Sequence, residues 1–127
     1  MAHIKSISPI DNKAYYLDES SSNDGELQNF LDFNPDKKLV VVMGLGFVGT
    51  VMSLVCANSK KEDYVVVGLD LATKESYWKI GMMKEGKLNV VSSDKKVLKF
   101  FENAKKNKNL FATHDKSILE HADIIII

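Results

Sequence analysis

From residue 39 onward, short apolar runs alternate with amphipathic segments. The apolar runs that predict strands cover residues 39–43, 64–69, 110–112 and 122–127. They are continuous and rich in β-branched residues, which is typical of strands buried on both faces of a parallel sheet. Apolar residues at helical spacing predict helices over residues 48–56, 74–84, 94–104 and 115–120. Strands that alternate with helices indicate βαβ units and an α/β fold.

The first 38 residues follow a different pattern. A polar run with turn-forming residues occupies positions 18–25, and a second cluster of helix breakers occupies positions 34–38. Between them, Leu27, Phe30 and Leu31 have the spacing of a short amphipathic helix. We therefore expect residues 1–38 to form an extension that lies on the surface or is partly irregular, and residues 39–127 to form the domain.

The sequence ends inside a run of four isoleucines, residues 124–127, with no turn, cap or polar tail after it. Natural domains seldom end on an unflanked run of buried-strand residues. We therefore expect the chain to be the first portion of a longer protein.

Composition narrows the class of protein. The chain has 127 residues, of which 45% are apolar and 27% charged, so it is too apolar to be disordered. Seventeen basic residues balance seventeen acidic ones, which argues against nucleic acid or an anionic membrane surface as a partner. No apolar run reaches the roughly 18 residues of a membrane span, and the N-terminus does not resemble a secretory signal. Because Cys56 is the single cysteine, we expect no internal disulfide and a reducing, cytoplasmic location.

One motif carries recognisable chemistry. Residues 44–49 match G-x-G-x-x-G between a predicted strand and a predicted helix, which indicates a partial Rossmann-type doubly wound parallel sheet of about four strands. Gly44 would allow the tight turn, Gly46 the close approach of a pyrophosphate, and Gly49 the close packing of the helix. The helix N-terminus would then face the phosphates. The candidate cofactor-binding residues of this loop are Gly44, Leu45, Gly46, Phe47, Val48 and Gly49.

Asp70 follows the second predicted strand, about twenty residues beyond the motif. Its carboxylate can accept hydrogen bonds from both hydroxyls of the adenosine ribose, and it would repel a 2′-phosphate. Leu71 and the two residues after it include no arginine that could reverse this preference. Asp70 and Leu71 therefore complete the predicted site, and NAD rather than NADP is the expected cofactor. The alternative is a purely structural glycine turn with a solvated carboxylate at the strand end.

Other candidate residues have simpler interpretations. Cys56 falls on the apolar face of a predicted helix and is expected to be a buried, inert thiol. His114 and His121 are seven residues apart with no third ligand nearby, so no metal site is predicted. Thr113 and Asp115 flank the end of the third predicted strand, where doubly wound sheets bind ligands, although capping of the next helix is the simpler role.

Three segments carry a resemblance to a known family. They are V-V-V-M-G-L-G-F-V-G at residues 40–49, V-V-V-G-L-D at residues 65–70, and F-A-T-H-D with A-D-I-I-I-I within residues 111–127. Together they resemble the N-terminal NAD-binding domain of nucleotide-sugar dehydrogenases of the UDP-glucose/GDP-mannose type. The resemblance implies an enzyme of polysaccharide biosynthesis that oxidises the C6 alcohol of a UDP-sugar to a uronic acid, in two hydride transfers to NAD.

The resemblance also implies what lies outside this chain. The catalytic residues of the family belong to later segments, so none is assigned here and the chain alone is expected to be inactive. Members are commonly dimers, so a homodimer is an expectation for the whole enzyme. Residues 86–95 lack the prolines and glutamate of the family's loop, and Glu75 stands where a basic residue is frequent. Two alternatives remain: the Rossmann domain of a 6-phosphogluconate-type or hydroxyacyl-type dehydrogenase, and a non-catalytic nucleotide-binding module.

Overall fold

A four-stranded parallel sheet forms the centre of the computed structural model, which describes residues 3–18 and 23–127. The strand order is β5-β4-β3-β6, and the strands are β3 (Lys38–Met43), β4 (Tyr64–Leu69), β5 (Leu110–Thr113) and β6 (Ile124–Ile126). Numbered within the sheet, this is the order 3-2-1-4 that begins a doubly wound nucleotide-binding sheet. The predicted Rossmann-type α/β class is therefore confirmed.

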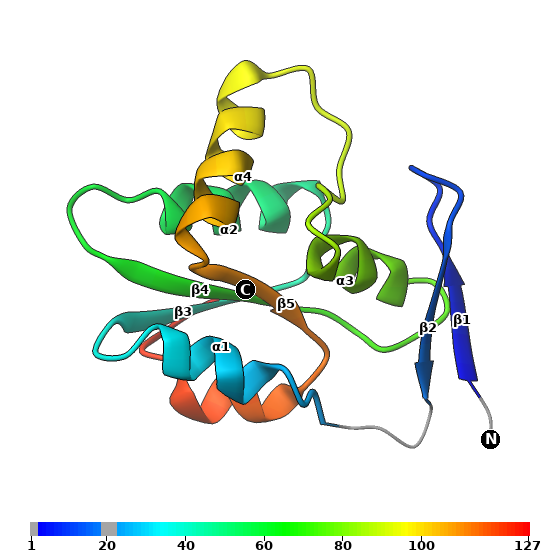
Figure 1. Ribbon diagram of the computed structural model, residues 1–127, viewed down its shortest axis with the longest axis horizontal. Coiled ribbons are helices and arrows are strands. Elements are labelled where there is room, and N and C mark those ends of the chain that lie inside the picture. The colour runs from blue at the N-terminus through cyan, green and yellow to red at the C-terminus, as the bar shows by residue number, and fades with distance from the viewer. Residues whose placement is uncertain (1–2, 19–22) are drawn as a thin grey trace.

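Helices cover both faces of this sheet, as Figure 1 shows. α2 (Phe47–Ala57) and α4 (Lys95–Asn107) lie on one face, and α1 (Leu27–Phe33) lies on the other with the 3₁₀ helix η1 (Lys116–His121). Alternate residues of β3 serve the two layers: Val40 and Val42 pack in the cluster with α2 and α4, whereas Leu39 and Val41 pack in the cluster with α1 and η1. All four are at most 4% exposed, which explains why the strand reads as a continuous apolar run.

A third apolar cluster joins the sheet to the N-terminal segment. β1 (His3–Ile7) and β2 (Ala14–Asp18) form an antiparallel hairpin that packs beside α3 (Tyr77–Lys84), as Figure 1 shows. Tyr15 of the hairpin is 5% exposed and shares this cluster with Ile80. A Cβ added to Gly81 would overlap the Tyr15 side chain, so α3 needs a glycine at this point to accept the ring. Gly81, which weakens the helix by itself, is thus explained by packing.

The N-terminal segment therefore holds more regular structure than its sequence predicts. Of the first 38 residues, two strands and a helix are formed, and Leu27 of α1 is buried against the sheet. The hairpin is also bonded to the domain, because Ser6 Oγ donates to the Lys74 carbonyl at 2.7 Å and accepts from the Trp78 N–H at 2.9 Å. Its strands are only five residues long, which is why periodicity did not reveal them. Residues 19–22 of the polar run lie outside the described residues.

The other predicted elements differ from the structure mainly at their ends. α3 begins at Tyr77 instead of residue 74, because the preceding residues form a turn in which the Tyr77 N–H donates to the Thr73 carbonyl at 2.9 Å. α4 continues to Asn107 and ends at Lys108, which has a left-handed φ of 54°. The segment predicted as a short helix after β5 is the 3₁₀ helix η1. Within the described parts of the chain, no helix has the length and apolar character needed to cross a bilayer.

Candidate functional site

The glycine-rich loop connects the carboxyl end of β3 to α2 and uses its glycines in three ways. Gly44 has a φ of +95°, a conformation that favours glycine. A Cβ added to Gly46 would meet no atom within 4 Å, so this side of the loop faces open space. A Cβ on Gly49 would overlap the carbonyl oxygen of Gly44, so the first turn of α2 lies directly against the loop. The loop thus has the tight turn, the open cradle and the close approach that a pyrophosphate site needs.

The N-terminus of α2 lies at the open side of the loop. Gly46 is the N-cap residue, and no side chain of the described residues caps this helix end. The first turn therefore offers backbone N–H groups and the positive end of the helix dipole to a ligand. The side chains of Phe47 and Val48 are 55% and 76% exposed, so they point into solvent and are not packed in the core.

Leu45 fixes the loop from inside the protein. Its side chain is fully buried, in the cluster that contains Ile80. Its N–H donates to Asp70 Oδ2 at 2.8 Å, and its carbonyl accepts from Thr50 Oγ1 at 3.2 Å and from Asn89 Nδ2 at 3.3 Å. Because both backbone groups are bonded, Leu45 would serve a cofactor by shaping the loop and not by direct contact through its N–H.

Asp70 lies at the carboxyl end of β4, where the sequence analysis placed it. Besides the Leu45 N–H on Oδ2, its Oδ1 accepts from the Leu71 N–H at 2.7 Å, and Lys79 Nζ is 3.9 Å from Oδ2. The side chain is 11% exposed, so Asp70 is not the solvated strand-end carboxylate of the alternative interpretation. Each carboxylate oxygen has a second lone-pair direction, which leaves acceptors for the two hydroxyls of a ribose.

A groove runs along the carboxyl edge of the sheet beside Asp70. It has a volume of about 630 Å³, and the residues that line it are Asn23, Asp70, Leu71, Ala72, Thr73, His114, Asp115, Lys116, Ser117 and Glu120. A smaller apolar hollow of about 360 Å³ adjoins it, with Met43, Gly44 and Leu119 in its wall beside Asp70 and Leu71. Polar and apolar surface thus meet at Asp70. A nucleoside needs both, because its ribose is polar and its base is flat and largely apolar.

The end of β5 forms the far wall of this groove. Asp115 Oδ1 accepts from the Ser117 N–H at 3.0 Å, so the expected capping role of Asp115 is confirmed. Thr113 Oγ1 accepts from the Asp115 N–H at 3.1 Å and donates to Asp24 Oδ2 at 2.7 Å. Burial alone would raise the pKa of Asp24, but hydrogen bonds from Lys84 and Thr113 outweigh it and lower that pKa. A buried carboxylate from the N-terminal segment therefore supports this wall from inside the protein.

The remaining candidate residues lie apart from the groove or have structural contacts. Cys56 is half-buried in α2, and burial raises the pKa of its thiol, which suits an unreactive cysteine. His114 is 8% exposed and packs edge-on to the Tyr77 ring, 6.1 Å between centroids. Among the described residues, no group of three or more His, Cys, Asp or Glu side chains is arranged to bind a metal ion.

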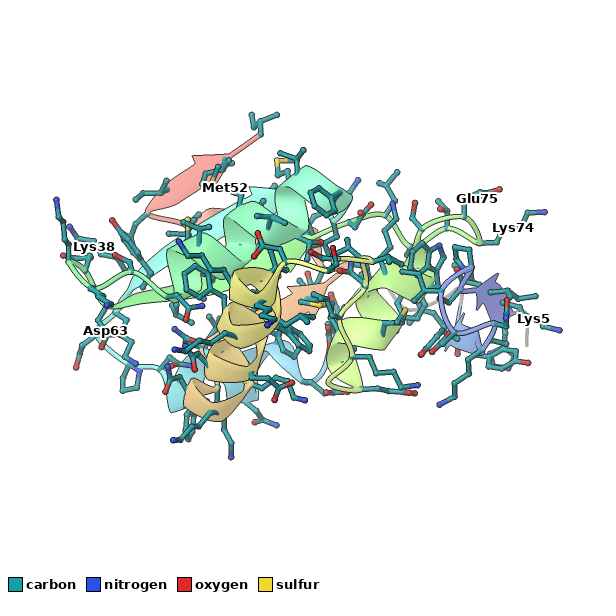
Figure 2. The ribbon with its side chains drawn as sticks, turned by 90° about the horizontal axis from the view of Figure 1, so that it is seen from above. Lys5, Lys38, Met52, Asp63, Lys74 and Glu75 are labelled. Carbon is teal, nitrogen blue, oxygen red and sulfur yellow. The ribbon has the colours of Figure 1, made fainter. Side chains whose placement is uncertain are left out.

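A larger hollow of about 750 Å³ lies at the amino edge of the sheet, lined by lysine and asparagine side chains together with Asp63. Figure 2 shows Lys38 and Asp63 at this end of the molecule and Lys74 and Glu75 at the other, beside the hairpin. α2 ends here at Ala57 and presents the negative end of its dipole, while the lysines of the lining bring positive charge to the same hollow. Neither Asp70 nor any residue of the glycine-rich loop lines it.

Sequence reasoning missed four residues that complete the site: Thr50, Asn89, Lys79 and Asp24. Thr50 and Asn89 are buried and hydrogen-bonded to each other at 3.0 Å as well as to the Leu45 carbonyl. The sequence does not show that Thr50 and Asn89 are partners, because they are 39 positions apart. Lys79 and Asp24 reach the site from α3 and from the N-terminal segment, which no local pattern predicts.

These features define a dinucleotide-binding domain of the Rossmann class, and comparison with known proteins identifies its family. Residues 38–127 match the family model described as "UDP-glucose/GDP-mannose dehydrogenase family, NAD binding domain". The match covers most of the chain, and the chain therefore belongs to this family, of which it contains the NAD-binding domain. Comparison with curated protein sequences gives no significant match.

A comparison with solved structures agrees with this fold. The chain is similar to an NDP-N-acetyl-D-galactosaminuronic acid dehydrogenase from Methanosarcina mazei Go1, with a TM-score of 0.63 and 21% identity. The similarity covers 81% of this chain but 22% of that protein, so the chain spans about a fifth of its length. The expected family and NAD-binding domain are thus confirmed, and the family match decides against the other dehydrogenase families considered from the sequence.

Proposed function

We propose that the groove binds NAD, with the pyrophosphate on the glycine-rich loop and the adenosine ribose on Asp70. The observation that carries this proposal is the open space at Gly46, directly before the uncapped N-terminus of α2. Gly44, Gly46 and Gly49 would form the cradle, and Phe47 and Val48 would supply first-turn amide groups. Leu45 would hold the loop in shape, and Leu71 would flank the ribose from the exposed side of the groove.

The charges around Asp70 support a preference for NAD over NADP. A 2′-phosphate on the ribose would meet this carboxylate in a setting that excludes much of the solvent. Lys79 is the cation nearest to Asp70 in the described structure, but at 3.9 Å it offsets only part of that charge and is itself 24% exposed. Glu75 lies on the turn before α3 beside Lys74 (Figure 2), so these two charges offset each other.

For the whole protein, we propose an NAD-dependent nucleotide-sugar dehydrogenase of the cytoplasm. Family membership supports oxidation of the C6 alcohol of a UDP-sugar to a uronic acid, with two hydrides passing to two NAD molecules in succession. NAD would supply the hydride acceptor, and the residues of this chain would bind and orient its adenosine half. We place the catalytic residues, the sugar site and most of a homodimer interface in segments of the family that this chain does not contain, so this chain alone would bind NAD without turning over substrate.

Titration calorimetry of NAD into the chain tests the proposed site. Asp70→Asn keeps the size of the side chain and one acceptor oxygen but removes the charge, so we expect NAD affinity to fall about tenfold or more. Asp63→Asn is the matched control, because Asp63 is 78% exposed at the opposite edge of the sheet. Equal affinity in the wild type and Asp70→Asn, or an equal loss in both variants, would refute this placement of the ribose.

A further inference from the structure

The N-terminal segment lies outside residues 38–127, the part that matches the family, yet it reaches the cofactor groove. Asn23 is one of the residues that line the groove, and Asp24, beside it, points into the domain. The Asp24 side chain is only 5% exposed, although the residue belongs to a loop. A carboxylate is buried to this extent only where it has partners, and Asp24 has partners on three different elements.

The first contact is with α3. Lys84 Nζ is 2.6 Å from Asp24 Oδ2, and the Lys84 side chain is 15% exposed. The same ammonium lies 4.6 Å from the centre of the Phe111 ring on β5, so it is enclosed between an anion and an aromatic face. This position connects the N-terminal segment to both α3 and β5.

The second and third contacts are with Thr113 at the end of β5 and with Asp115, which caps η1. Asp24 Oδ2 also accepts from Thr113 Oγ1 at 2.7 Å, and the Asp24 N–H donates to Asp115 Oδ2 at 3.0 Å. Thr113 is completely buried and Asp115 is 7% exposed, so these bonds are shielded from water. Asp24 thus bonds both ends of the turn formed by Thr113, His114 and Asp115.

This turn is joined to the ribose-binding strand as well. The Asp70 N–H donates to the Thr113 carbonyl at 3.2 Å, and His114 and Asp115 line the groove together with Asp70. A displacement of the turn would therefore alter the width of the groove next to Asp70. Such a change would weaken ligand binding, because the groups that bind a ligand must be held in place by the residues around them.

We propose that Asp24 is a positioning residue for the adenosine end of the cofactor groove, so that the N-terminal segment is a working part of the NAD site. The proposal rests on the function proposed above, because it concerns the same groove. Asp24 does not touch the cofactor; it acts through Thr113 and Asp115. The segment, through Asn23, then forms a third wall of the groove, in addition to the segments that follow β4 and β5.

Two variants separate this role from a general loss of stability. Asp24→Asn removes the charge that pairs with Lys84 while keeping the shape of the side chain. Thr113→Val removes only the hydroxyl and leaves the Asp24–Lys84 ion pair intact, and Thr113→Ser restores the hydroxyl. Asp32→Asn is the matched control, since Asp32 lies exposed on α1 of the same segment. Circular dichroism at the titration temperature establishes that each variant is folded.

The measurement is calorimetric affinity for NAD and for ADP, which carries the adenosine end alone. We expect Asp24→Asn and Thr113→Val to weaken both ligands about tenfold, and Thr113→Ser and Asp32→Asn to bind like the wild type. Wild-type affinity in folded Thr113→Val, or a loss that Thr113→Ser does not restore, overturns the positioning role and leaves the proposed function standing. Failure of the wild-type chain to bind either ligand overturns the proposed function, and this inference with it.

Discussion

The carboxylate of Asp70 accepts a hydrogen bond from the backbone N–H of Leu45 at 2.8 Å, across 25 positions of sequence. The residue predicted to bind the ribose therefore also fixes the loop predicted to bind the pyrophosphate. Gly44 strengthens this connection, because its N–H donates to the Leu69 carbonyl at 2.8 Å, directly before Asp70. The two parts of the proposed adenosine-diphosphate site are thus joined to each other by hydrogen bonds.

Loss of the Asp70 charge is expected to affect stability as well as binding. In Asp70→Asn, one of the two N–H groups on the carboxylate keeps only a weaker, neutral acceptor, and the other faces the amide NH2 group and loses its acceptor. We expect the free energy of unfolding to fall by about 1 kcal/mol, the typical worth of one such hydrogen bond. Urea unfolding at neutral pH measures it, with the exposed Asp63→Asn as control. An unchanged midpoint in Asp70→Asn would mean that the Leu45 bond contributes nothing to folding.

Two glycines of the same loop should respond in opposite ways to alanine. Gly46→Ala places a methyl group in open space, so stability should change by only a few tenths of a kcal/mol while NAD affinity falls about tenfold or more. Gly49→Ala forces a methyl group against the Gly44 carbonyl and should destabilise the fold by about 1–3 kcal/mol. Thermal unfolding and calorimetry distinguish the two, and the account is wrong if Gly46→Ala binds NAD normally.

Gly81→Ala tests how firmly the hairpin belongs to the domain. Alanine in place of glycine normally stabilises a helix interior by about 0.5–1 kcal/mol. Here the added methyl group would overlap the Tyr15 ring, so we expect a destabilisation of about 1–3 kcal/mol. In a Tyr15→Ala background the overlap with the ring is gone and only the close contact with the Cβ of residue 15 remains, so the same change should destabilise much less, which a double-mutant cycle of unfolding free energies measures. The same effect in both backgrounds would show that the hairpin does not pack on α3 as described.

The Asp24 network predicts a pH dependence of stability. Lys84, Asp115 and Glu26 are the charged groups around Asp24, and the net effect of its surroundings is to lower its pKa below the ordinary 3.8. The unfolded chain then takes up this proton more readily, so the stabilisation is complete above pH 3.8 and is lost as the pH falls through the folded-state value. The stability difference between wild type and Asp24→Asn should therefore be larger at about pH 7 than at about pH 3. Urea midpoints measured across that range would contradict this if the difference stayed constant.

Sequence alone predicts the elements whose formation depends on residues close together in the chain. The buried strands β3 and β4 and the helix α2 follow from apolar runs and spacing around the glycine motif, and Asp70 follows from its distance to that motif. The hairpin does not, because its burial depends on Tyr15 meeting Gly81, which no periodicity encodes. Asp24 is likewise 89 positions from Thr113, and only the folded chain brings a loop carboxylate to the end of β5.

The most direct test of the central claim compares NAD and NADP side by side. Both are titrated by calorimetry into the wild-type chain under identical conditions. Because the proposed site places the ribose hydroxyls at Asp70, the account predicts measurable binding of NAD and at least about tenfold weaker binding of NADP. Equal affinity for the two cofactors, or no binding of NAD, would contradict it.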